Sequence, residues 1–115
     1  MDAQLDFQRL DVYRCAIEFL QFSLYVCRRL PRGERDLRDQ LKRAVMSIPL
    51  NIAEGSGKLT GADRSRFHAI ARGSAMECGA LLDVCAIAGY VNETDARKGR
   101  ELILRLVAML SRMCR

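Results

Sequence analysis

Apolar residues recur at steps of three and four residues along four stretches of this chain, which is the spacing of amphipathic α-helices. Chain-breaking segments separate the stretches at Pro31–Gly33, Ser56–Gly61 and Gly89. The pattern predicts helices over residues 10–30, 34–55, 62–88 and 93–113. Four helices of similar length with short connections predict a single domain, residues 1–115, with an all-α fold: an antiparallel up-down-up-down four-helix bundle.

The spacing also predicts which positions face the core. In the second helix they are Leu37, Leu41, Ala44, Ile48 and Ile52. In the third helix they are Phe67, Ile70, Ser74, Cys78, Leu81, Cys85 and Ala88. In the fourth helix they are Leu102, Ile103, Leu106, Val107, Leu110 and Met113. Thr60 with Asp63, and Asn92 with Asp95, have the spacing of helix N-caps.

The first helix is more apolar than a bundle requires. Nearly every position from Val12 to Leu30 outside one narrow polar stripe is apolar, whereas a bundle helix needs about three positions in seven. We therefore interpret part of this helix as a subunit interface, because an exposed surplus would reduce solubility. The alternative is a single, unusually buried helix.

The second helix contains a proline and a row of polar residues. Pro49 has no N–H to donate, so we expect a kink, with Ser47 and Asn51 placed to satisfy the loosened backbone. Gly55 and Gly57 are expected to supply left-handed positions that end the helix.

Polar residues of the second and third helices suggest a shared network. An Arg–Glu pair with bridging hydroxyl and amide groups is the commoner outcome, and a catalytic carboxylate pair of Glu54 with Glu77 is the alternative. The predicted structural network consists of Arg43, Ser47, Asn51, Glu54, Arg72, Ser74 and Glu77.

Composition argues against several classes of protein. No apolar run reaches the length of a membrane span, and acidic and basic residues near the N-terminus interrupt any signal-peptide core. Five irregularly spaced cysteines argue against a disulfide framework and favour the cytoplasm. His68, the sole histidine, has no partner at metal-ligand spacing and is interpreted as a surface or packing residue. We expect no enzymatic activity, no catalytic residue, no cofactor and no metal.

The positive charge is concentrated in one part of the chain. The net charge is +5, and residues 28–72 hold eleven basic and five acidic residues. Such an excess can attract a phosphate backbone, although an ordinary solvated helix face is the alternative. The predicted nucleic-acid-binding residues are Arg28, Arg29, Arg32, Arg35, Arg38, Lys42, Lys58 and Arg64.

Two sequence blocks resemble one bacterial family. The first runs from Gln40-Leu41 through Ser47-Ile48-Pro49 to Glu54-Gly55, and the second joins Phe67 to Ala71-Arg72-Gly73-Ser74 and Glu77. They resemble the four-helix-bundle proteins encoded by intervening sequences in bacterial 23S rRNA genes. That family is similar to the accessory variability protein of diversity-generating retroelements, which forms a pentamer and binds nucleic acid alongside a reverse transcriptase. Ser56 departs from the family pattern, where an aromatic is frequent, and so does His68, where an aliphatic is common.

The resemblance and the charge together give two hypotheses. The first is a cytoplasmic homo-oligomeric ring, a pentamer by resemblance, that binds RNA or DNA through its basic surface. The second is a protein-directed adaptor or scaffold, for example for a reverse transcriptase, without direct nucleic-acid contact. The two differ at high salt, which weakens phosphate contacts steeply and apolar contacts little.

Overall fold

The computed structural model describes residues 3–114 and contains five helical elements. They are η1 (Asp6–Arg9, a short 3₁₀ helix), α1 (Asp11–Arg29), α2 (Arg35–Ser56), α3 (Gly61–Ile87) and α4 (Glu93–Met113). No strand occurs in this described range. The limits of α1 to α4 differ from the predicted ones by at most one residue, whereas η1 was not predicted.

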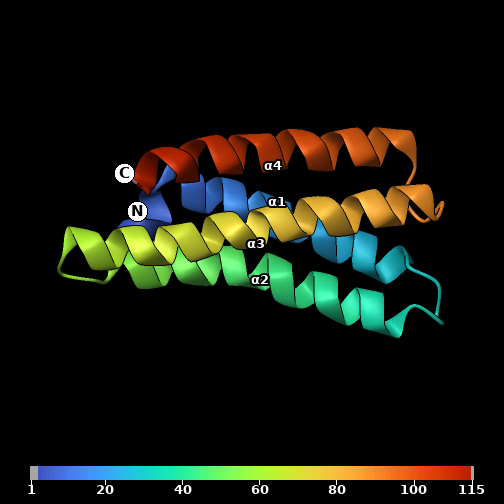
Figure 1. Cartoon of the computed structure of the whole chain (residues 1–115), viewed down its shortest axis with the longest axis horizontal. Coiled ribbons are helices and arrows are strands. Elements are labelled where there is room, and N and C mark those ends of the chain that lie inside the picture. Colours follow the sequence, from blue (N-terminus) through green and yellow to red (C-terminus); the bar gives the residue numbers. More distant parts are fainter. Residues whose placement is uncertain (1–2, 115) are drawn as a thin grey trace.

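The four long helices form an antiparallel bundle. Each of α1 and α3 packs against both α2 and α4, so the helices occupy the corners of a square in chain order (Figure 1). The α1–α2 and α3–α4 turns lie at one end of the bundle, and the α2–α3 turn lies at the other with both termini. The predicted all-α, four-helix architecture is confirmed.

Side chains and one glycine set the helix limits. The Asp63 N–H donates to Thr60 Oγ1 over 3.1 Å, and the Asp95 N–H donates to Asn92 Oδ1 over 2.8 Å. Both predicted N-caps are therefore present, at the starts of α3 and α4. Gly89, with a φ of +83°, lets the chain leave α3, and the Tyr90 N–H then donates to the Cys85 carbonyl over 2.8 Å.

The predicted end of α2 was wrong in its detail. Gly57 has an ordinary φ of −84°, and Gly55 lies buried inside the helix. A Cβ at Gly55 would come within 3.0 Å of His68 Nε2 and 3.1 Å of Phe67 Cβ. Gly55 is needed because α2 and α3 approach closely there, not because the chain turns.

The core is one continuous cluster with contributions from all four long helices. Its largest fully buried side chains are Phe19, Leu41, Ile48, Ile52, Leu106 and Leu110. The stripe predicted for α2 is buried apart from Leu37, which is half-buried. The stripe predicted for α3 was partly wrong, because Ile70 is 43 % exposed and His68, Ala71 and Ala75 face the core instead.

Among the long helices α3 exposes the most large apolar residues, whereas α1 exposes none. Every large apolar residue of α1 is at least half-buried within this one chain, in part because η1 folds back on it and the Phe7 ring meets Tyr13 edge-on at 4.9 Å. On α3, by contrast, Ile70, Val84 and Ile87 are 43, 51 and 89 % exposed. Together with exposed Gly73 and Ala80 they step by threes and fours, with Glu77 in the same register, and we call Ile70, Gly73, Ala80, Val84 and Ile87 the α3 outer stripe.

Candidate nucleic-acid interface

The predicted nucleic-acid-binding residues divide between the two ends of the bundle. Six of them surround the α1–α2 turn and are called the turn cluster: Arg28, Arg29, Arg32, Arg35, Arg38 and Lys42. Lys58 and Arg64 flank the α2–α3 turn at the opposite end, and α2 between them spans roughly 33 Å at 1.5 Å per residue. Residues that are neighbours in sequence thus form two basic sites rather than one.

Most side chains of the turn cluster are free to meet a ligand. Arg28, Arg29, Arg32, Arg35 and Lys42 are exposed. Arg35 pairs with Asp39 at 4.0 Å across an exposed face, where such a pair contributes little stability. The Arg29 guanidinium lies 5.3 Å from the Tyr25 ring centre. Arg28, Arg32 and Lys42 form no ion pair within the described residues.

Arg38 and Arg64 have structural tasks in addition to their charge. The Arg38 guanidinium donates to the carbonyls of Cys27, Leu30 and Pro31 at 3.0–3.2 Å. The Cys27 and Pro31 carbonyls also accept the N–H groups of Leu30 and Glu34, so within residues 3–114 Arg38 is the sole donor to the Leu30 carbonyl. Arg64 Nη1 donates to the Lys58 and Leu59 carbonyls of the α2–α3 turn. Unlike the other members of the turn cluster, Arg38 is half-buried.

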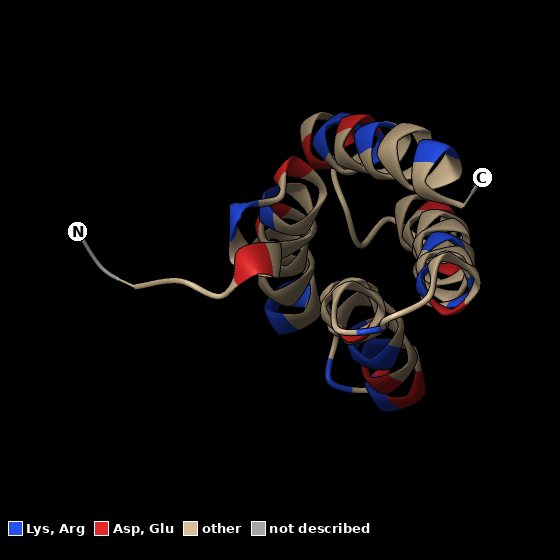
Figure 2. Cartoon of the chain, turned by 90° about the vertical axis from the view of Figure 1, so that its left-hand side faces the viewer, with Lys and Arg blue, Asp and Glu red and all other residues tan. Residues whose placement is uncertain are grey.

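Acidic residues lie among the basic ones over much of the surface. Figure 2, viewed along the bundle, shows Lys and Arg intermingled with Asp and Glu on the helices rather than gathered on one side. The other ion pairs among the described residues, Arg97–Glu93 and Arg105–Glu18, are also exposed and span 3.8 Å. The turn cluster likewise contains acidic neighbours, Glu34, Asp36 and Asp39, and is not a uniformly basic face.

The predicted polar network is present only between the middles of α2 and α3. The Ser47 and Ser74 hydroxyl oxygens lie 2.8 Å apart, and the Asn51 amide donates to the Ser47 carbonyl and hydroxyl at 2.8 and 2.9 Å. Asn51 therefore reinforces the Ser47 carbonyl, not the Val45 carbonyl that Pro49 leaves without a helical donor, while α2 continues through the proline.

The charged members of the predicted network lie outside it. Arg72 Nε donates to Ser111 on α4 over 2.8 Å, so it joins α3 to a different helix. Arg43, Glu54 and Glu77 are exposed and make no hydrogen bond or ion pair within residues 3–114. Neither the Arg–Glu pair nor a buried carboxylate pair is formed.

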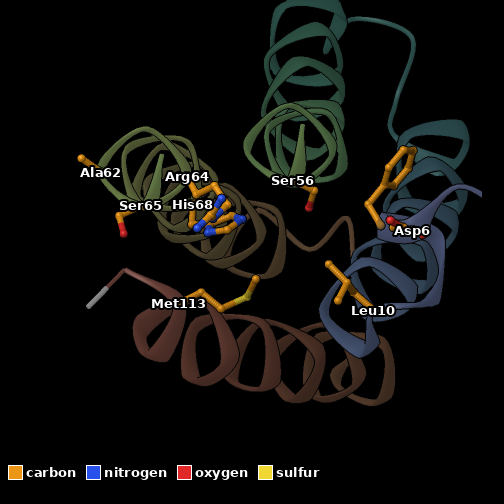
Figure 3. A pocket seen from close by; sticks show the side chains of 10 residues that line it. Asp6, Leu10, Ser56, Ala62, Arg64, Ser65, His68 and Met113 are labelled. Carbon is orange, nitrogen blue, oxygen red and sulfur yellow. The ribbon is translucent and has the colours of Figure 1, made fainter. Parts of the chain in front are cut away.

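A cavity that sequence reasoning missed opens at the α2–α3 end of the bundle. It has a volume of about 740 Å³ and lies between η1, the end of α2, the start of α3 and the end of α4 (Figure 3). Ser56 and His68, the two departures from the family pattern, both line it, as do Phe7, Leu10 and Met113.

His68 is a buried residue rather than a surface one. Its side chain is only 5 % exposed, and neither ring nitrogen has a hydrogen-bond partner within the described chain. Burial lowers the pKa of the His68 imidazole below its usual value. The Met113 backbone lies close enough to act in the opposite direction, although the contact does not have the geometry of a hydrogen bond, and the positive charge of Arg64 acts with burial. The sequence signal was weak, because a polar residue on the core side of a helix is recognised only once the inward face is known.

The cysteines and the acidic residues are distributed without disulfides or metal-holding clusters in the part of the chain that the structure describes. All five thiols are free, four of them buried, and burial raises the pKa of Cys78 to about 12. No three His, Cys, Asp or Glu side chains of residues 3–114 gather where they could hold a metal ion. None of the helices in that range is long and apolar enough to cross a lipid bilayer.

Comparison with known proteins gives the family. The family model described as 23S rRNA-intervening sequence protein matches residues 8–112. No match was found among curated proteins. One similar solved structure is the crystal structure of a protein of unknown function from the S23 ribosomal protein family of Bacteroides thetaiotaomicron VPI-5482. The two chains are 20 % identical, with 90 % of this chain and 98 % of that chain covered and a TM-score of 0.85, so the likeness concerns the fold. Because the family model spans nearly the whole sequence, this chain belongs to the 23S rRNA-intervening sequence protein family.

Proposed function

We propose that this protein is a non-enzymatic, self-associating four-helix bundle that binds RNA or DNA through the turn cluster. The observation that carries the proposal is the grouping of Arg28, Arg29, Arg32, Arg35 and Lys42, all exposed, around one turn. Phosphate contacts by such residues supply affinity with little dependence on base sequence. The cytoplasm is the compartment we propose, because five free thiols suit a reducing environment.

Self-association is supported by the α3 outer stripe. Ile70, Val84 and Ile87 present apolar side chains to solvent at heptad-like spacing, and Gly73 and Ala80 between them allow another backbone to approach. The proposed partner is a second copy of the chain, and a ring is the proposed arrangement, with five copies suggested by the family resemblance alone. Light scattering of wild type and of Val84→Glu/Ile87→Glu tests this part. A control, Leu104→Glu, removes an apolar residue that is 64 % exposed on α4.

Nucleic-acid binding is tested by its dependence on salt. Titrations of single-stranded RNA and duplex DNA at several salt concentrations should give log K falling linearly with log salt, with a slope of about −0.9 per phosphate neutralised on a duplex. Arg28→Glu/Arg32→Glu should weaken binding and reduce the slope by about 2. Arg14→Glu/Arg105→Glu makes the same change in net charge at exposed positions away from the turn, and should change the slope less. A flat salt response that neither variant alters would refute the proposal.

The α3 outer stripe also favours a second candidate function, a protein-directed adaptor. Apolar contacts to another protein would persist at high salt, where phosphate contacts fail. If wild type stays monomeric, binds neither nucleic acid, and retains a protein partner at high salt that Val84→Glu/Ile87→Glu releases, the adaptor function replaces the first proposal.

A further inference from the structure

Two rows of residues with the same charge pattern flank the seam between α2 and α3. The α2 row is Arg43, Ser47, Leu50 and Glu54, and the α3 row is Arg66, Ile70, Gly73 and Glu77. Steps of four, three and four residues keep each row on one helix face. All of these residues are exposed except Ser47, which is half-buried. Each row therefore begins with an arginine, ends with a glutamate and has an exposed apolar residue between them.

The charges at the ends of the rows are free in the single chain. None of the four forms an ion pair within residues 3–114. The Arg66 guanidinium instead lies 4.7 Å from the Phe67 ring centre. Between the charges, Leu50 and Ile70 are 62 and 43 % exposed. An apolar centre with a charged rim is typical of a surface that binds another protein.

The register of α2 against α3 brings opposite charges to the same height along the bundle. The Ser47 and Ser74 hydroxyl oxygens lie 2.8 Å apart across the seam, which fixes the register. Because the two helices are antiparallel (Figure 1), counting outward from this contact brings the arginine of each row level with the glutamate of the other. They are level to within about one residue, or 1.5 Å of rise. The apolar residues Leu50 and Ile70 are level in the same way.

We propose that the α2 row of one copy packs against the α3 row of a second copy, with the two bundles parallel. Rotation about an axis along the bundle leaves every residue at its own height, so level residues of different copies meet. The contacts between copies are then Arg43 with Glu77, Leu50 with Ile70, and Glu54 with Arg66. The choice of a second copy rests on the proposed self-association. This orientation places the turn clusters of both copies at the same end.

Antiparallel copies would also bring opposite charges together, because α2 would then face α2 and α3 would face α3. That arrangement would set Leu50 of one copy against Ser47 of the other, an apolar side chain against a polar one. The parallel arrangement covers Leu50 with Ile70 instead, so both exposed apolar side chains leave water together. We prefer the parallel arrangement for this reason.

Charge reversal distinguishes the two arrangements. Light scattering over a series of protein concentrations, at low ionic strength where exposed pairs are least screened, measures self-association of Arg43→Glu, of Glu77→Arg and of their equimolar mixture. A second mixture combines Arg43→Glu with Glu54→Arg. Lys98→Glu and Glu101→Arg make the same changes in charge at exposed positions on α4 and serve as controls.

We expect Arg43→Glu and Glu77→Arg each to raise the concentration needed for half-association by about tenfold or more, because like charges then meet. The controls should leave that concentration unchanged. The mixture of Arg43→Glu with Glu77→Arg should restore association, since each variant supplies the charge that the other lacks. An ion pair within one chain cannot be restored by mixing two chains, so this result supports contact between copies.

Restoration by Glu54→Arg in place of Glu77→Arg would show antiparallel copies and would overturn the proposal. Reversals that act no more than the controls, or a loss of association that neither mixture restores, would also overturn it. The proposed self-association fails separately, if wild type stays monomeric at every concentration. It stands without this arrangement if Val84→Glu/Ile87→Glu dissociates the copies while the reversals at Arg43 and Glu77 do not.

Discussion

Gly55→Ala tests whether the close approach of α2 and α3 stabilises the fold. The added Cβ would lie 3.0 Å from His68 Nε2, 3.1 Å from Phe67 Cβ and 3.2 Å from His68 Cδ2, all closer than ordinary contact. The Phe67 Cβ is fixed by its own backbone, so rotating a side chain cannot relieve that contact.

Two opposing terms set the magnitude. Overpacking a core position costs typically about 1–3 kcal/mol. Replacing a helical glycine gains at most about 1 kcal/mol, and less in the last turn where Gly55 lies. The net expectation is a loss of about 1 kcal/mol in the free energy of unfolding, or roughly 4 °C in Tm for a domain of this size.

Gly79→Ala is the matched control for this variant. Its Cβ would meet Ile103 Cδ1 at 3.8 Å, an ordinary contact, so this variant should be more stable than wild type by about 0.5–1 kcal/mol. Urea unfolding at pH 7.5, where His68 is neutral, measures both. The reasoning is refuted if Gly55→Ala is as stable as wild type or if both variants shift in the same direction.

Three further outcomes follow from the contacts described. Arg38→Met should lower the free energy of unfolding by about 1–3 kcal/mol, because three hydrogen bonds to carbonyls at the α1–α2 turn are lost and the Leu30 carbonyl keeps no donor within residues 3–114. Exposed Arg35→Met should change it by less than about 0.5 kcal/mol, and urea midpoints distinguish the two variants. Ser47→Ala and Ser74→Ala should each cost about 1 kcal/mol, and the double variant less than their sum, since each removes the partner of the other; a double-mutant cycle that adds would contradict this. The pKa of His68 is lower in the folded chain than in the unfolded chain, so the unfolded chain takes up the proton first as the pH falls. The free energy of unfolding should therefore decrease as the pH drops through about 6.5 toward the folded pKa. The charged residues that line the same cavity are Arg64 and Asp6. His68→Phe should remove that slope between pH 8 and 5.5, and an unchanged slope would show that another group titrates.

The helices could be predicted because their signals are local. Periodicity, the Thr60 and Asn92 caps and the Gly89 exit depend on a few neighbouring residues, and the structure contains each of them. The exception is η1, a single short turn whose position depends on its packing against α1. Sequence alone gave no reason to place Phe7 over Tyr13.

Which face of a helix points inward could not be predicted where two faces look alike. On α3 the sequence contains two apolar stripes at the same spacing, one through Ala71 and Ala75 and another through Ile70 and Val84. Only the position of α2 and α4 decides between them. For the same reason the sequence analysis assigned the exposed apolar surface to α1. In the structure η1 and the neighbouring helices cover the apolar residues of α1, and those of one face of α3 are exposed instead.

The spatial grouping of the candidate site residues could not be predicted from their order in the sequence. The basic residues of segment 28–72 are close in sequence, but α2 runs the whole length of the bundle between them. Arg32, before α2, and Arg64, after it, therefore lie at opposite ends. The cavity needed contributions from η1, α2, α3 and α4, which are far apart in sequence. The sequence showed only that His68 has no metal-binding partner nearby in sequence. Its burial, which lowers the pKa of the imidazole, became visible only in the structure.

If both proposed surfaces act as proposed, their arrangement would make self-association and nucleic-acid binding interdependent. The α3 outer stripe runs along the side of the bundle and the turn cluster lies at one end, so copies packed in parallel would bring every turn cluster to the same rim. Antiparallel packing would alternate the basic ends instead. When several copies on one rim contact the same strand, the overall affinity can exceed that of a single copy by a factor of roughly 10²–10⁴, because each further contact forms at a high effective concentration. Val84→Glu/Ile87→Glu should therefore weaken binding to a long strand by more than tenfold although no basic residue is changed, while binding to a strand too short to bridge two copies should weaken far less. Equal losses on long and short strands would show that the added acidic charge, rather than the separation of the copies, caused the effect.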